Sequence, residues 1–159
     1  MERAAARNRG TVPAGMRWNA EQYRNAQVIT QVGRSLGASD RDITIALMAA
    51  MVESGMRNLD YGDRDSIGMF QQRNAWGSRA ARRDPYQSAR MFFLGGMSGQ
   101  RGLLDFRNRD RMGLGQAAQA VQVSAFPDRY QQRLGDATEL IRSMISLGEN
   151  DRGSWVASF

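Results

Sequence analysis

The sequence predicts a mainly α-helical single domain with a small β-hairpin element after its second helix. Its 159 residues, of which 42% are hydrophobic, are enough for one compact core. Apolar residues recur at helical spacing in several segments, and capping side chains precede the first two of them. The chain shows no internal repeat and no linker between separate cores. We therefore expect a flexible basic arm over residues 1–17 and one domain over residues 18–159.

The first two helices are predicted by capping boxes. Asn19 and Ser39 are each followed, three positions later, by a glutamine or aspartate that can complete the box. The first helix is expected to end at Gly37. In the second helix, residues 43–52 are almost purely apolar on every side. This helix is therefore expected to lie buried at the centre of the domain.

No helical period continues from residue 55 to residue 77. Residues 61–66 have the composition of a turn, and residues 66–71 are consistent with a short strand or hairpin arm. Helices are then expected again over residues 85–94, where Asp84 and a following proline mark the start, and over residues 116–124. Pro127 is expected to begin a long helix that ends near Gly148.

The composition excludes several classes of catalytic site. There is no cysteine and no histidine, which excludes thiol nucleophiles, Cys/His zinc sites and Ser-His-Asp hydrolases. All 22 basic residues are arginine, so lysine nucleophiles and bases are excluded as well. Carboxylate chemistry remains, and it requires no cofactor or metal.

A net charge of +6 and a pI near 10.9 favour attraction to polyanions such as nucleic acid or an anionic cell wall. The arginines are dispersed, as in a solvated basic surface, and no nucleic-acid-binding motif is present. We therefore expect no specific nucleic-acid partner. No apolar run approaches the ~20 residues of a membrane span, and the amino-terminal residues lack the apolar core of a signal peptide.

Glu53 ends the apolar run of the second helix. If the helix continues, this carboxyl group projects from the same buried face as Ala46 and Ala50. Burial raises the pKa of a carboxyl group, and a neutral carboxylic acid at working pH is what a general acid for glycosidic cleavage must be. The alternative is that the helix ends at Val52, so that Glu53 faces solvent or pairs with Arg57.

The residues around Glu53 resemble a known family, the lysozyme-like lytic transglycosylases. In that family a Glu-Ser pair at the end of a buried helix precedes a Gly-Leu-Met-Gln signature, and this chain has Glu53-Ser54 and Gly68-Met69-Phe70-Gln71. The resemblance covers residues 20–146 and is closest to the variant of high-GC bacteria and their phages. The family's Ala-Tyr-Asn-Ala-Gly segment, which lines the groove, is replaced by residues 120–124, Ala-Val-Gln-Val-Ser, without the tyrosine.

The resemblance implies a lysozyme-like fold and cleavage of the β-1,4 bond between N-acetylmuramic acid and N-acetylglucosamine in peptidoglycan. Glu53 would act first as acid and then as base, and a 1,6-anhydro product would form without the second carboxylate of most glycosidases. It also implies action at a cell wall, outside the cell or from a virion, and a phage or cell-wall parent protein as a partner. A non-catalytic glycan-binding or structural module on the same fold remains the alternative.

The candidate substrate-binding residues each have a structural alternative. Gln71 and Gln72 are suited to sugar hydroxyl and N-acetyl groups, although Gln71 could instead cap backbone groups of the turn. Ser54 could bond to Glu53 or to its local backbone. Tyr61 or Tyr130 could supply an aromatic ring to a sugar, or be a core residue. The last candidate is Gln122, which lies in the segment that replaces the family's groove-lining residues.

The aspartates after the second helix leave two further alternatives open. Asp63 or Asp65 could be a second carboxylate that makes the enzyme a hydrolase, and together with Asp60 they could bind calcium. The spacing lacks the glycine and distal glutamate of an EF-hand. Turn structure is therefore favoured for all three, and no metal site is expected.

Overall fold

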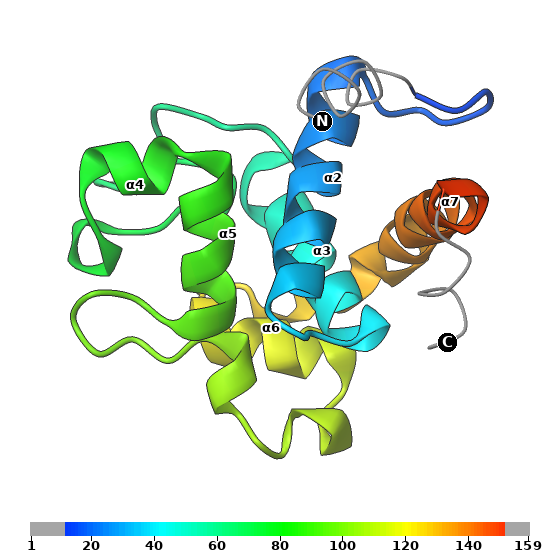
Figure 1. Ribbon diagram of the computed structural model, residues 1–159. Helices are drawn as coiled ribbons and strands as arrows, with labels where there is room; N and C mark the ends of the chain where they lie inside the picture. The colour runs from blue at the N-terminus through cyan, green and yellow to red at the C-terminus, as the bar shows by residue number, and fades with distance from the viewer. Residues whose placement is uncertain (1–11, 152–159) are drawn as a thin grey trace.

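Helix α3 (Asp40–Ser54) forms the centre of the fold. The computed structural model describes residues 12–151, except for the side chains of residues 146–151. Every residue from Ile43 to Met51 is buried. The helices α2 (Ala20–Ser35), α6 (Leu114–Gln122) and α7 (Leu134–Asp151) pack against α3, and α5 (Pro85–Leu94) packs mainly against α2 (Figure 1). The prediction of a mainly helical domain with a buried second helix is confirmed.

Both predicted capping boxes are present. The Asn19 side chain accepts a hydrogen bond from the Gln22 backbone N–H at 2.8 Å, and Ser39 accepts one from the Asp42 N–H at 3.1 Å. Helix α3 continues to Ser54 and is capped by Gly55, whose φ of 64° is in the left-handed region that glycine adopts without strain. The helix therefore includes Glu53, which lies on its last turn.

The predicted β-hairpin is wrong. Within residues 12–151 there is no strand, and residues 66–72 contain a single antiparallel bridge between Ile67 and Gln72. Gly68 and Gln71 have positive φ values of 84° and 50°. Two left-handed residues inside one short turn bend the backbone away from the extended conformation that a ladder of strand hydrogen bonds needs.

A short helix, α4 (Arg79–Arg83), follows this turn and contains a buried arginine, an exception to the solvated basic surface expected for the dispersed arginines. Arg82 is only 4% exposed. Its guanidinium donates to the carbonyl oxygens of Gly77, Asp65 and Gln72 at 3.0, 2.8 and 3.2 Å, and to the side-chain oxygen of Asn74 at 2.9 Å. The loop of residues 65–77 thus wraps around one charged group.

The predicted long helix from Pro127 begins later. Two 3-10 turns, Pro127–Arg129 and Gln131–Arg133, precede α7, which starts at Leu134 and continues past Gly148 to Asp151. Tyr130 lies between the two turns and is completely buried. The interruption directs the Tyr130 side chain into the domain, beside the end of α3.

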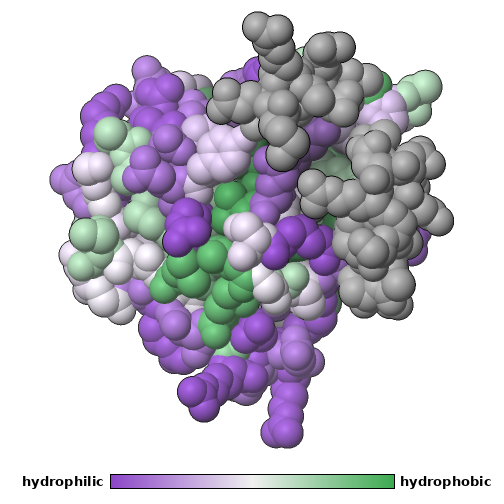
Figure 2. Space-filling view, viewed as in Figure 1, coloured by the Kyte–Doolittle hydropathy of each residue, from purple (hydrophilic) through white to green (hydrophobic). Residues whose placement is uncertain are grey.

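The predicted basic arm lies partly outside the described residues, which begin at residue 12. From there on, Val12 and Met16 pack against the core, and Arg17 pairs with Asp136. Figure 2 shows hydrophobic residues in a strip through the middle of the face on which α5 lies beside α2, with polar residues around it. Among the helices described, none is long and apolar enough to cross a membrane.

Candidate active site

Glu53 and Tyr130 form a hydrogen-bonded pair at the end of α3. The Tyr130 hydroxyl donates to Oε2 of Glu53 at 2.5 Å. Helix α3 positions the glutamate on its last turn, and the break before α7 positions the tyrosine. Glu53 is partly buried and Tyr130 fully so. The prediction that Glu53 projects from the buried side of a continuing helix is therefore consistent with its position.

The surroundings of Glu53 favour its neutral form. Burial raises the pKa of the Glu53 carboxyl, and hydrogen bonds from Tyr130 and Gln122 lower it by less. The pKa of Tyr130 is also raised, first by burial and then by its hydrogen bond to Glu53. Tyr130 therefore stays a hydroxyl donor over the whole pH range in which a carboxyl group titrates.

Gln122, at the end of α6, joins the pair to the turn after α3. Its amide lies close enough to Glu53 to lower the pKa of that carboxyl group, and its Nε2 donates to the Phe70 carbonyl oxygen at 2.9 Å. Ser124, two residues later, lies close enough to Tyr130 to lower the pKa of its hydroxyl group. Gln122 was predicted to contact substrate, whereas Ser124 was not singled out. The signal available for Ser124 was its place in the same segment, at the last residue of a predicted helix.

Ser54 connects α3 to the following loop and does not bond to Glu53. It is 8% exposed, and its hydroxyl donates towards the carbonyl oxygens of Ala50 and Met69 at 3.1 and 2.7 Å. The same oxygen accepts from the Arg57 N–H at 3.1 Å. These contacts match the local backbone role that was the alternative for this serine.

Gln71 and Tyr61 lie together in the loop after α3. The Gln71 amide donates to the carbonyl oxygens of Tyr61 and Gly68, both at 3.1 Å. Its side chain thus caps the turn, which was the alternative to substrate binding. The Tyr61 side chain is 66% exposed, so its ring is free of the core.

Gln72 faces the interior. It is 3% exposed, and its Nε2 donates to the Ser88 carbonyl oxygen of α5 at 3.0 Å. Its buried Oε1 has no hydrogen-bond partner in the structure. Contact between a glycan and Gln72 would need the loop to open, because the side chain is covered.

The two candidate second carboxylates lie in the loop and pair with arginines. Asp65 accepts a hydrogen bond from Arg73, which lowers the pKa of Asp65, so this group is ionised at neutral pH. Asp63 is largely exposed, with Arg64 at 4.0 Å. Neither hydrogen-bonds to Glu53. Within the described part of the chain, no cluster of three metal-ligating side chains is found.

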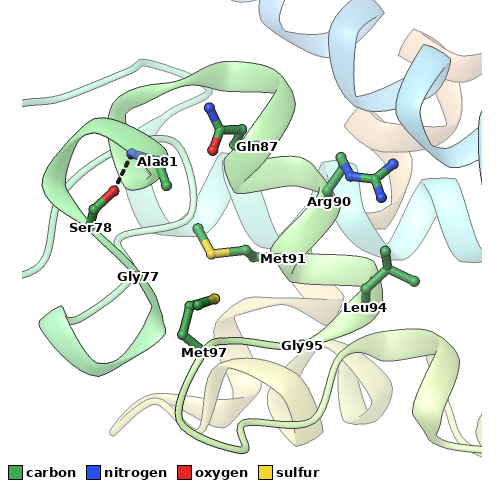
Figure 3. Close-up of a pocket in the computed structure, with 9 residues that line it drawn as sticks. All are labelled: Gly77, Ser78, Ala81, Gln87, Arg90, Met91, Leu94, Gly95 and Met97. Carbon is green, nitrogen blue, oxygen red and sulfur yellow. Dashed lines mark hydrogen bonds between the residues drawn. The ribbon is translucent and has the colours of Figure 1, made fainter.

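Two pockets in the structure are lined by neither Glu53 nor Tyr130. The α4–α5 pocket, of about 390 Å³, is lined by residues that include Met91, Leu94, Met97 and Arg90 (Figure 3). No acidic residue lines it, so it has no carboxyl group for acid–base chemistry. The α6 pocket, of about 470 Å³, borders the segment that carries Ser124 and Tyr130, and is lined by Gly115, Gln116, Gln119, Pro127, Asp128 and Gln131.

Comparison with protein-family models and with curated proteins gave no match for this chain.

Proposed function

We propose that the chain is a lytic transglycosylase with a lysozyme-like fold that cleaves the β-1,4 bond between N-acetylmuramic acid and N-acetylglucosamine in peptidoglycan. The observation that carries the proposal is the Glu53–Tyr130 pair. A carboxyl group whose pKa is raised by burial, and which accepts a hydrogen bond from a hydroxyl group at 2.5 Å, has the properties expected of a general acid. The motif resemblance around Glu53-Ser54 supplies the substrate class.

The proposed reaction uses one carboxyl group twice. Tyr130 donates to Oε2, so the acidic proton of neutral Glu53 belongs on Oε1. Transfer of this proton to the glycosidic oxygen breaks the bond from that oxygen to C1 of the muramic acid and releases the next sugar. The Glu53 carboxylate then accepts the proton of the 6-hydroxyl group, whose oxygen bonds to C1. A 1,6-anhydro end forms, and Glu53 regains its proton.

The loop aspartates favour this route over hydrolysis with a second carboxylate. In a two-carboxylate glycosidase the second group lies within about 10 Å of the acid and faces the same bond. Asp65 instead pairs with Arg73, and Asp63 extends into solvent. A lysozyme-type hydrolase, with one of these aspartates activating water, is the less favoured version of the same proposal.

The proposed setting is a cell wall outside the cytoplasm, reached in a phage virion or tail or as part of a cell-wall protein. The net charge of +6 supports attraction to an anionic wall. The second candidate function is a glycan-binding or structural virion module without catalysis. The fully buried Tyr130 ring, which is unable to stack on a ligand, makes a purely binding role for this pair less favoured.

The test is mass spectrometry of the fragments that the intact protein and Glu53→Gln release from purified peptidoglycan. We expect 1,6-anhydro-muramyl ends from the intact protein and none from the variant, because an amide cannot donate the proton. Glu139→Gln, at an exposed position of α7, is the matched control and should cleave normally. Reducing ends would bring Asp63 or Asp65 into the mechanism, and an absence of fragments from the intact protein would favour the non-catalytic module.

A further inference from the structure

Val123, the residue after α6, has a backbone conformation that valine rarely adopts. Its φ of 49° and ψ of 51° lie in the left-handed region, which a β-branched side chain makes costly. Its neighbours both lie near the candidate active site: Gln122 donates to the Phe70 carbonyl oxygen and lowers the pKa of Glu53, and Ser124 lowers the pKa of Tyr130. Residues two apart on a continuing helix point to different sides. The left-handed turn thus allows both side chains to reach the same pair.

Gln119 holds this turn in place. Its side-chain oxygen accepts hydrogen bonds from the backbone N–H and the hydroxyl of Ser124, both at 3.2 Å, and its Nε2 donates to the Ser124 carbonyl oxygen at 2.9 Å. A strained backbone persists only where the surrounding contacts determine it, and such strain is concentrated at ligand-binding and catalytic sites.

The outer side of the turn is apolar although it is exposed. Val123 is 77% exposed and Phe126 is 55% exposed. The guanidinium of Arg129 lies over the Phe126 ring, 3.9 Å from its centre, so it covers one face of a ring that is otherwise exposed. An exposed aromatic ring next to polar groups is a typical wall of a ligand site, and it suits the C–H face of a pyranose.

The α6 pocket lies along the same segment. Its volume of about 470 Å³ falls within the range of small-molecule sites, roughly 300–1,000 Å³. The side-chain oxygens of Gln116 and Gln131 accept hydrogen bonds from the backbone N–H groups of Gly113 and Gly115 at 3.4 and 2.8 Å. No described residue accepts a hydrogen bond from their NH2 groups. Two amide donors are thus available to uncharged oxygen acceptors.

We propose that residues 123–131 form a glycan-binding element that extends the site beyond Glu53. The Phe126 ring packs on the apolar face of one sugar, and the amides of Gln116 and Gln131 donate to hydroxyl or N-acetyl oxygens of a neighbouring sugar. This inference rests on the proposed function, because its ligand is the strand that Glu53 cleaves. An uncharged glycan is favoured over an anion, because amides and the carboxylate of Asp128 line the pocket.

The experiment measures binding of a soluble β-1,4-linked tetramer of N-acetylglucosamine by calorimetry, in the Glu53→Gln background so that the probe is not cleaved. Phe126→Ala and Gln116→Ala, each added to this background, should weaken the affinity about fivefold or more, because each removes one stacking contact or one hydrogen bond. The matched controls are Met97→Ala, which truncates a side chain that is 82% exposed, and Gln87→Ala, both at the α4–α5 pocket. Neither control should change the affinity.

The outcomes separate this inference from the proposed function. If Phe126→Ala or Gln116→Ala leaves the affinity unchanged, the contact proposed for the substituted residue is wrong. If Glu53→Gln alone does not bind the tetramer, the whole proposal is wrong. In both cases, cleavage of peptidoglycan by the intact protein leaves the proposed function standing. Weakened binding in both test variants, together with no cleavage by the intact protein, supports the glycan-binding element and rejects the proposed function.

Discussion

The Tyr130 hydroxyl lies 2.5 Å from Oε2 of Glu53, across a separation of 77 residues in the sequence. Burial raises the pKa of Glu53, and the hydroxyl acts in the opposite direction because a hydrogen-bond donor stabilises the carboxylate. In the proposed mechanism, the pair therefore balances the neutral form of Glu53, which acts as the acid, against its charged form, which acts as the base. Changing either residue shifts that balance in a direction that can be measured.

Glu53→Gln is expected to stabilise the fold at high pH. Because the folded-state pKa of Glu53 lies above the unfolded value, its stabilising contribution is present below the unfolded pKa and is lost as pH rises through the folded pKa. The amide carries no charge at any pH. Above that window the variant should melt at a higher temperature than the intact protein, and the difference should shrink on acidification.

Thermal melts from about pH 3 to pH 9 measure this difference, since the range brackets carboxyl titration. Glu139→Gln, at an exposed position of α7, is the control and should show no such pH dependence. A Glu53→Gln variant that is much less stable at every pH would show that Glu53 serves the fold as a structural hydrogen-bonding group, and the assignment as an acid would be wrong.

Tyr130→Phe should raise the pKa of Glu53 further, because it removes a hydrogen bond that lowers it. The alkaline limb of the pH–rate profile for glycan cleavage should then move to higher pH, and the maximal rate should fall about tenfold, the equivalent of one hydrogen bond. The free energy of unfolding should fall by about 1–3 kcal/mol, because a buried acceptor loses its donor.

The matched control for this change is Tyr61→Phe, at a side chain that is 66% exposed. It should change neither the pH–rate profile nor the free energy of unfolding. A Tyr130→Phe variant with an unchanged pH–rate profile would mean that Tyr130 supports the fold without adjusting Glu53. The pH profile distinguishes the two roles, whereas the loss of stability alone does not.

Arg82→Met should destabilise the protein strongly. The guanidinium is the hydrogen-bond donor to three backbone carbonyl oxygens and the Asn74 side chain. Leaving several buried acceptors unpaired costs about 1–3 kcal/mol each, so the total loss should exceed about 3 kcal/mol. Urea denaturation measures it. Arg90→Met, at an exposed arginine of α5, should cost less than about 0.5 kcal/mol. Similar losses for the two variants would contradict the role assigned to Arg82.

Gly68→Ala should also destabilise the fold. Gly68 has a φ of 84°, and an added Cβ would lie 2.1 Å from the Arg82 carbonyl oxygen. The left-handed backbone alone costs an alanine about 1–2 kcal/mol, and relief of the clash must displace α4 as well. We expect a total loss above about 2 kcal/mol by urea denaturation.

Gly135→Ala provides the comparison, because an added Cβ there meets no atom within 4 Å. It lies in the first turn of α7, where alanine should stabilise the helix by up to about 1 kcal/mol. If Gly68→Ala were as well tolerated as Gly135→Ala, the turn over residues 66–72 would be more adaptable than its geometry indicates.

Local signals were sufficient for the first two helices and for the position of Glu53 at the end of the second. The capping boxes at Asn19 and Ser39 and the apolar run of α3 act within a few residues, so their pattern could be interpreted without the fold. The prediction of a β-hairpin failed because Gly68 and Gln71 both adopt left-handed conformations, and nothing in the pattern distinguishes a turn of this kind from a short strand. The roles of the two consecutive glutamines could not be predicted from the sequence either, since Gln71 caps the turn while Gln72 is buried.

The sequence by itself determined a helical domain with one carboxyl group at the end of a buried helix and no cysteine or histidine chemistry. Only the tertiary structure decided that Tyr130, and not Tyr61, contacts that carboxyl group, and that Arg82 is interior. The physical reason is that these contacts join segments far apart in the chain. Their free energy depends on how the helices pack, and a periodicity of three or four residues carries no information about that packing.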